Sequence, residues 1–350
     1  MKKIPKLTLV FLMIIFLVYF IISKSINIKK NKNQIIKKIL LYKIFKLTRK
    51  NINNISSIFI SGKAHFGNYF ISINNAIIYC EFLGCKNIIM ENNKNIYINN
   101  TIFYNKSKIA IEPNKSFNSR DNNTIILNVF FFFFNGFRYL KNIYRLRIFK
   151  NQLINNLPKI LTHPNDLYIY IRGGDIFHQS PPNSASNYFQ PPLCFYSKIL
   201  NDFKFRHIFI ISKDSLNLVI SNLLCKYPYV KLKKNNIKID ISYLVHSYNL
   251  VAAKSTFFLT SIKFNDKLKF LWEYDCSGLY QKYLHLHYSI YDSPYYYTIY
   301  KMNSSNNYKK LMHPWINSPN QRKLMLIEKC TKNFDITSYK MIMPKFSLNT

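Results

Sequence analysis

Short apolar runs of β type that alternate with helical patterns most constrain the fold of this chain. Ser57–Ile60 (SIFI) is one such run, and Asn87–Met90 (NIIM) is another. Apolar residues recur between them at helical spacing, and Gly84 predicts the end of that helix. The helical face consists of Ile73, Ile77, Cys80 and Leu83. Strand, helix and strand in this order predict a βαβ unit with parallel strands.

A second alternating pattern begins after His163. Its predicted strands are Leu167–Ile171, His207–Ser212 and Tyr229–Lys233. A helical run, Ser215–Leu224, lies between the last two, and Asp240–Lys263 has the pattern of helix, strand, turn and helix. The chain is therefore expected to form two Rossmann-like α/β domains that face a cleft, at residues 55–162 and 163–350.

The chain begins with an apolar segment that predicts a membrane anchor. Residues 1–6 form a short basic tail, and residues 7–22 carry no charge. As a helix of about 1.5 Å per residue, the run spans roughly 24 Å, slightly short of a bilayer core of about 30 Å. No good cleavage site follows, which favours an uncleaved signal anchor, and residues 23–54 form a basic stem. The aromatic run Phe130–Phe134 is too short to span a membrane and predicts a buried strand or helix.

Charge and cysteine content leave several function classes open. The formal net charge is +35, which suits nucleic acid, an anionic membrane or phosphorylated ligands. The lysines are scattered among Asn and Ile without dense basic blocks, so nucleic-acid binding is kept only as an alternative. The six cysteines form no CxxC pair and therefore no zinc signature, and they are compatible either with disulfides or with buried thiols.

Three loops are expected at the carboxyl ends of parallel strands, where such sheets bind ligands. They are GKAHFGN (62–68), RGGDIF (172–177) and AKSTFF (253–258). An arginine, glycines that admit backbone N–H groups, hydroxyls and a helix N-terminus are the parts of a diphosphate site. Each loop also has a purely structural interpretation. Gly67-Asn68 can be a turn, Arg172 and Asp175 a salt bridge, and Ser255-Thr256 a helix N-cap.

The order of these three motifs resembles the GT-B fucosyltransferase group, which includes α1,2- and α1,6-fucosyltransferases and protein O-fucosyltransferases. HFGNYFISINNAIIYCEFLG resembles the loop that opens the group's first helix, YIRGGDIF its arginine motif, and LVAAKSTFF its Ser-Thr-Phe turn. The resemblance implies that Arg172 holds the β-phosphate of GDP-fucose. The other donor-binding residues that it implies are Phe66, Gly67, Asn68, Tyr170, Asp240, Ser255, Thr256 and Phe257. Residues 55–162 would then be the acceptor side, and residues 163–350 the donor domain.

One position departs from the family pattern. Tyr170 stands where the group has histidine, and tyrosine is not a base near neutral pH because its ordinary pKa is about 10. The remaining candidate bases are Asp175 and His65. Asp240 either contacts the guanine base or caps the helix that leads to Ser255. The chain has no Asp-x-Asp motif for a metal, so Arg172 and backbone dipoles are expected to stabilise the leaving group.

These features predict a membrane-anchored, inverting, metal-independent glycosyltransferase of the Golgi or endoplasmic reticulum, with its catalytic domain in the lumen. It would need no cofactor beyond its nucleotide-sugar donor and would act on a glycan or protein hydroxyl. Because Tyr170 departs from the pattern, a catalytically silent relative that binds glycan or peptide is the main alternative.

Overall fold

The computed structural model describes part of the chain. The described residues are 56–60, 67, 69–70, 72–73, 76–77, 80, 84–91, 102–104, 109–112, 124–127, 150–178, 190–252, 255–275 and 297–339. The predicted anchor, the stem and the aromatic run at Phe130–Phe134 lie outside these residues. Among the helices that are described, none is both long and apolar enough to cross a membrane.

The first half contains a five-stranded sheet of order β3-β4-β2-β1-β5. Its strands are β1 (Ser57–Ile60), β2 (Asn87–Met90), β3 (Ile102–Tyr104), β4 (Ile109–Glu112) and β5 (Thr124–Leu127). All pairs are parallel except β3 with β4 at one edge. The chain passes from β1 to β2 on one side and later places β5 on the other side of β1. The strand order therefore reverses beside β1, directly before the GKAHFGN segment.

The predicted βαβ unit is confirmed in the first half. β1 and β2 have the predicted bounds, and the described residues from Gly67 to Cys80 are helical. Ile73, Ile77 and Cys80 are fully buried, as the helical face requires. Gly84 has φ 73°, which favours glycine, and its amide donates to the carbonyl of Cys80 at 2.9 Å, so the helix ends where the sequence predicts.

The second half contains a seven-stranded sheet of order β12-β11-β10-β9-β6-β7-β8. Its strands are β6 (Leu167–Tyr170), β7 (Ile208–Ile211), β8 (Val230–Lys233), β9 (Asn249–Val251), β10 (Phe270–Asp275), β11 (Tyr297–Asn303) and β12 (Asp335–Tyr339). Only β12 is antiparallel to its neighbour. The predicted parallel sheet is confirmed, and β10 to β12 extend it beyond the strands that the sequence patterns indicated. The chain builds outward from β6 to β8 and then returns to place β9 on the other side of β6.

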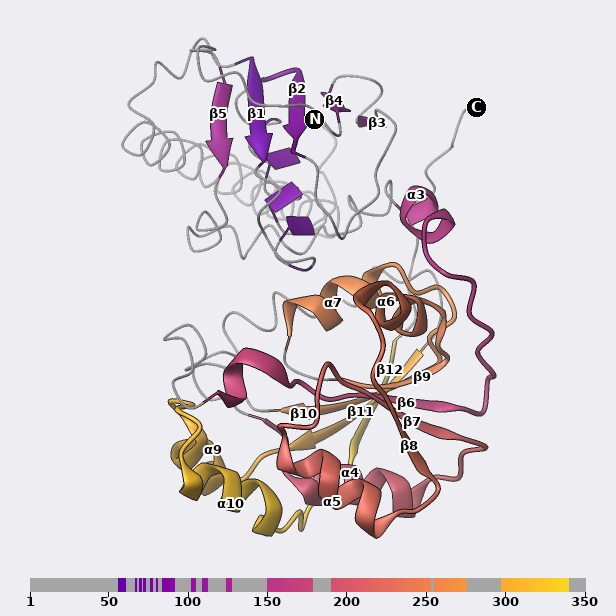
Figure 1. Cartoon of the computed structure of the whole chain (residues 1–350), viewed down its shortest axis with the longest axis vertical. Helices are drawn as coiled ribbons and strands as arrows, with labels where there is room; N and C mark the ends of the chain where they lie inside the picture. Colours follow the sequence, from indigo (N-terminus) through magenta and orange to yellow (C-terminus); the bar gives the residue numbers. More distant parts are fainter. Residues whose placement is uncertain are drawn as a thin grey trace, which may run out of the picture.

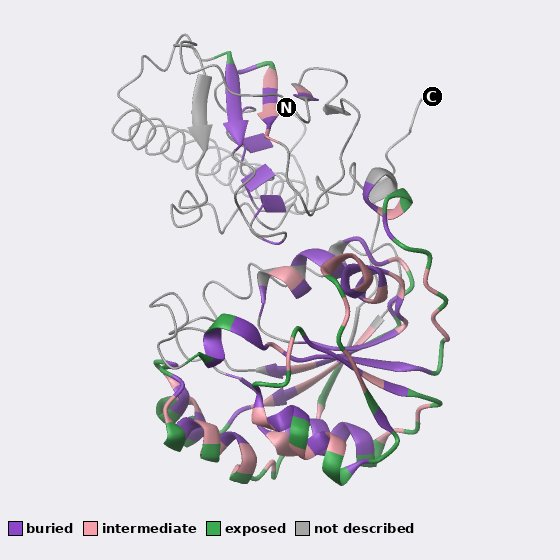
Figure 2. Ribbon diagram, in the orientation of Figure 1, coloured by how far each residue is buried: buried purple, intermediate pink, exposed green. Residues whose placement is uncertain are grey.

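Helices cover both faces of the seven-stranded sheet (Figure 1). One face carries α4 (Leu193–Asp202), α5 (Leu218–Lys226), α9 (Asn306–Met312) and α10 (Pro319–Ile327), and the other carries α6 (Ile237–His246) and α7 (Thr256–Lys263). The short helices α3 (Lys150–Asn155) and η4 (Gly174–Phe177) lie before and after β6. Buried residues concentrate on the strands and on the helix faces turned toward them (Figure 2). The buried apolar residues form two clusters, one for each helical layer.

The described part of the chain contains two disulfides. Cys80 pairs with Cys85 in the first half, and Cys194 of α4 pairs with Cys330, which follows α10. Cys225 is an exposed free thiol, and Cys276 lies outside the described residues. The disulfide alternative is therefore realised for four cysteines. The second bridge joins residues 136 positions apart, which restricts the unfolded chain strongly.

Candidate functional site

The candidate site lies where the strand order of the seven-stranded sheet reverses. Arg172 follows β6, Ser255 follows β9, and these two strands are parallel neighbours. Open α/β sheets bind ligands outside the carboxyl ends of the strands at such a reversal. Topology alone therefore brings two of the three sequence motifs to one edge of the sheet.

The guanidinium of Arg172 joins the two loops. Its Nη2 donates to Oδ1 of Asp175 at 3.0 Å, and its Nη1 donates to Oγ of Ser255 at 3.5 Å. The side chain of Arg172 is 23% exposed, whereas that of Asp175 is 59% exposed. The salt bridge allowed by the sequence is therefore present, but an exposed pair of this kind contributes only about 0–1 kcal/mol.

Two glycines and an acid hold the loop that carries Arg172. A Cβ atom on Gly173 would lie 2.5 Å from Oδ1 of Asp214, closer than real Cβ atoms come to any atom. Gly174 has φ 75°, and its amide donates to Oδ2 of Asp214 at 2.8 Å. Asn217 donates from Nδ2 to the carbonyl of Arg172 at 3.2 Å. The backbone conformation at Gly174 favours glycine, and a side chain at Gly173 would displace the carboxylate of Asp214.

Sequence reasoning missed Asp214 and Asn217 as site residues. The sequence patterns did not single out Asp214. They placed Asn217 inside the predicted helix Ser215–Leu224, whereas the helix begins at Leu218. Asn217 is the N-cap of that helix and accepts from the amide of Val219 at 3.0 Å. An acid and an asparagine that directly follow the strand next to the arginine strand are the signal that could have identified them.

Ser255 is the N-cap of α7, which confirms the capping interpretation. Its Oγ accepts from the amide of Phe257 at 3.2 Å, and the residue is 2% exposed. Thr256 is the first residue of α7. Capping and anion binding are compatible because the first turn of a helix carries several unpaired amides and the positive end of its dipole.

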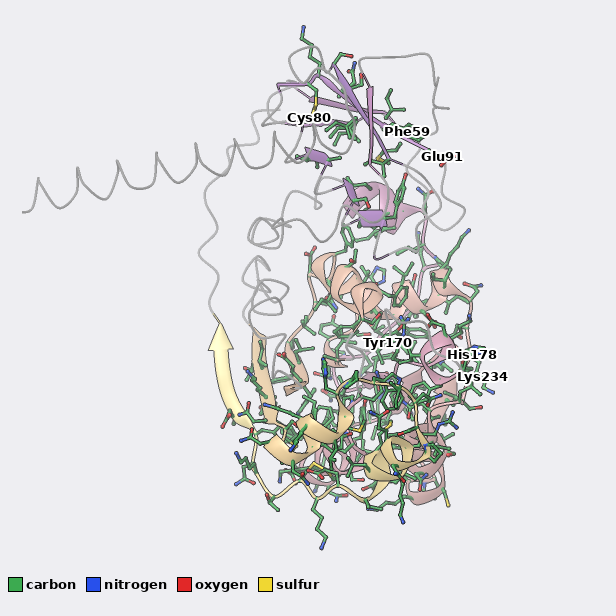
Figure 3. All side chains as sticks on the ribbon, turned by 90° about the vertical axis from the view of Figure 1, so that its left-hand side faces the viewer. Phe59, Cys80, Glu91, Tyr170, His178 and Lys234 are labelled. Atoms are coloured by element: carbon green, nitrogen blue, oxygen red, sulfur yellow. A yellow bond between two sulfur atoms is a disulfide. The ribbon has the colours of Figure 1, made fainter. Side chains whose placement is uncertain are left out.

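Tyr170 packs beneath the site and remains protonated. Its ring lies 5.4 Å from that of Phe257 and 5.8 Å from that of Phe258, centroid to centroid. Burial raises the pKa of the Tyr170 hydroxyl above its ordinary value of 10, although the charge of Arg172 and hydrogen bonds to Ser255 and Arg172 act in the opposite direction. Figure 3 shows Tyr170 among the side chains of the second half. The hydroxyl can orient neighbouring groups, but it cannot accept a proton near neutral pH.

The alternative that Asp240 caps the helix leading to Ser255 is wrong, whereas the alternative that it contacts the guanine base stays a prediction. Asn236 is the N-cap of α6, because its Oδ1 accepts from the amide of Ile239 at 3.1 Å, and asparagine caps as well as aspartate. Asp240 lies inside the first turn, 7% exposed, and accepts from Nδ2 of Asn235 at 3.1 Å. Burial raises the pKa of its carboxyl from 3.8 to about 6, and the bond from Asn235 limits the increase. Its charge also acts on Tyr170.

The GKAHFGN motif of the first half contacts helix α7. Gly67 is buried and helical, and its carbonyl accepts from Oγ1 of Thr260 at 3.4 Å. The rings of Phe70 and Phe264 lie edge to face, with centroids 5.1 Å apart. Thr260 follows Ser255 by five positions, about 7.5 Å along a helix axis. His65, Phe66 and Asn68 themselves lie outside the described residues.

The described residues contain no group of three or more His, Cys, Asp or Glu side chains that could hold a metal ion. Comparison of the sequence with protein-family models and with curated proteins finds no match. The site must therefore be interpreted from its own chemistry.

Proposed function

We propose that this chain is a glycosyltransferase that holds the diphosphate of a nucleotide sugar between Arg172 and the N-terminus of α7. One observation carries the proposal: the guanidinium of Arg172 lies 3.5 Å from the hydroxyl that caps this helix. A full positive charge and the positive end of a helix dipole, about half a charge, meet there. The carboxylate of Asp175 balances part of this charge, and a phosphate anion would interact favourably with both positive groups.

Further features support a donor site of the GT-B type. The second sheet reverses its strand order at this point, and the contact of Gly67 with Thr260 brings the first half against α7. Phe66 and Asn68 flank Gly67 in the sequence and would therefore enter near the donor. The resemblance to the fucosyltransferase group assigns GDP-fucose as the donor.

Transfer would proceed with inversion. The acceptor hydroxyl would attack the anomeric carbon from the side opposite the diphosphate, while Arg172 and the amides of α7 stabilise the charge on the leaving group. Tyr170 is buried and protonated, so the proton would pass to Asp175 or His65.

A place in the secretory pathway accords with the disulfides. The bridge between Cys194 and Cys330 suits an oxidising compartment. The apolar segment at residues 7–22 would anchor the chain in the membrane of the Golgi or endoplasmic reticulum, with the α/β halves in the lumen.

A second candidate function is a silent relative that keeps the nucleotide site but binds a glycan or peptide without transfer. The observation that favours it is Tyr170, a buried and protonated side chain where the resembled group has histidine. Both candidates predict nucleotide binding, and they differ only in turnover.

Calorimetric titration of GDP into the chain tests the shared prediction. Arg172→Ala should weaken GDP binding roughly tenfold to hundredfold, because a hydrogen bond to a charged group contributes about 1.5–3 kcal/mol. Lys310→Ala on α9 removes the same charge from an exposed position and should leave the affinity unchanged. Equal affinities for wild type and Arg172→Ala would refute the site. Fucose transfer to a panel of glycan and protein acceptors then separates enzyme from silent relative.

A further inference from the structure

Helices α9 and α10 and the connection His313–Ser318 form a C-terminal hairpin. Its side chains donate hydrogen bonds to the loop that carries Arg172. Three consecutive backbone carbonyls at the end of η4 accept hydrogen bonds from its side chains. The donors are Trp315 Nε1 to Ile176 at 2.8 Å, Arg322 Nη2 to Phe177 at 3.3 Å and Asn317 Nδ2 to His178 at 2.7 Å. These residues are about 140 positions apart in the chain, so the contacts define the tertiary position of η4 rather than its local shape.

The donors of the hairpin are themselves fixed. Trp315 is 1% exposed, and its ring meets that of Phe177 edge to face at 5.4 Å. Asn317 has φ 57°, a conformation that asparagine tolerates, and its Oδ1 accepts from Nε of Arg322 at 2.8 Å. Because these hydrogen-bond donors are themselves held in place, they restrict the positions of the carbonyl groups that accept from them.

The hairpin is in turn tied to the body of the second half. Cys330, three residues after α10, is bonded to Cys194 of α4 through a disulfide. Tyr308 of α9 donates to the carbonyl of Gln190 at 2.8 Å, and Ser318 and Gln321 form a capping box at the start of α10. The hairpin is thus a rigid support and not a loose C-terminal appendage.

Side chains from elsewhere in the chain hold η4 by hydrogen bonds at both of its ends. Asp214 holds the amide of Gly174, the hairpin holds the carbonyls of residues 176 to 178, and Asp175 lies between them. Asp175 accepts from Nη2 of Arg172 at 3.0 Å, so the position of η4 sets the direction of the guanidinium. A displacement of about 1 Å in a positioned group can cost two orders of magnitude in function.

We infer that Trp315 and Asn317 are positioning residues, which orient Arg172 toward the N-terminus of α7 through η4. The inference rests on the proposed function, because it assigns these residues to the anion site at Arg172. A hairpin that serves only to stabilise the fold would make the same contacts, and the two roles differ in how they couple to Arg172.

Two conservative substitutions in the full chain test the inference. Trp315→Phe keeps the aromatic packing and removes one donor. Asn317→Asp keeps the tolerated backbone conformation and the acceptor for Arg322 but removes the donor to His178. Each should weaken the binding of inorganic pyrophosphate, measured by calorimetry, about fivefold, the factor that one neutral hydrogen bond is worth. In an Arg172→Ala background neither should cause a further loss, because they act through Arg172.

Ser305→Ala is the matched control. Ser305 caps α9 by accepting from the amide of Tyr308 at 3.0 Å, so its loss weakens the same hairpin without touching η4. It should lower the melting temperature and leave pyrophosphate affinity unchanged. If Arg172→Ala weakens binding while Trp315→Phe and Asn317→Asp match the control, the positioning role is wrong and the anion site stands. If Arg172→Ala has no effect, both proposals are wrong.

Discussion

Asp240 makes the stability of the second half depend on pH, with a sign that can be measured. Burial raises the pKa of this carboxyl from 3.8 to about 6, so between these values the folded chain holds a proton that the unfolded chain releases. The stability contributed by the protonated carboxyl is fully present below pH 3.8 and is lost as the pH rises through 6. Asp240→Asn keeps the acceptor for Asn235 and removes the titration.

The expected magnitude follows from the shift. A difference of about 2 pKa units at about 1.4 kcal/mol per unit gives roughly 3 kcal/mol. Asp240→Asn should therefore gain roughly 3 kcal/mol over wild type in the free energy of unfolding between pH 4 and pH 7.5. The gain should be complete above pH 6, where the wild-type carboxylate is charged and buried.

Urea unfolding followed by tryptophan fluorescence provides the assay. The chain has two tryptophans, Trp272 and Trp315, and both lie in the second half with Asp240. Asp202→Asn is the control, because Asp202 is 39% exposed and pairs with Lys198 on the surface of α4. Parallel stability profiles for wild type and Asp240→Asn across this pH range would refute the reasoning, whatever their absolute values.

Two further predictions concern the support of the site. Gly173→Ala should destabilise the chain by about 1–3 kcal/mol in thermal unfolding, the usual cost of overpacking, because the new methyl group would meet Asp214 at 2.5 Å. A second substitution, Asp214→Ala, should remove part of that penalty, and a penalty that stays unchanged would contradict the clash. Reduction of the bridge between Cys194 and Cys330 should lower the free energy of unfolding by about 2–5 kcal/mol. The double variant Cys194→Ala with Cys330→Ala should already be destabilised and lose less on reduction; an equal loss would mean that the effect of reduction comes from the bridge between Cys80 and Cys85.

The sequence patterns predicted the local elements best and the long-range contacts least. SIFI and NIIM are strands with the predicted bounds because each is a short apolar run between polar residues, too short for a buried helix. One of the two interpretations of Asp240, as the cap of α6, is wrong because asparagine and aspartate both cap helices and only the backbone position shows that Asn236 does so. The hydrogen bonds from the hairpin to η4 join residues about 140 positions apart, and no local pattern encodes such a pairing.

The sequence patterns predicted the candidate site only in part, because they indicate positions along strands but not contacts between distant residues. The order of strands implied that Arg172 and Ser255 would both lie at carboxyl ends, and the structure makes those strands neighbours. The contribution of Asp214 depends on a contact across 40 positions with a glycine amide, which composition and spacing do not reveal. His65, Phe66, Asn68 and the anchor lie outside the described residues, so those expectations remain predictions.

Helix α7 and its flanking residues contact both Arg172 and the first half of the chain. The first turn of α7 lies beside Arg172, while Thr260 in its middle and Phe264 directly after its end contact the first half. Binding that altered the contacts of Thr260 or Phe264 would therefore act on the helix whose first turn lies beside Arg172. Binding in the first half and anion binding in the second would then be energetically coupled, and each would alter the other by the same factor.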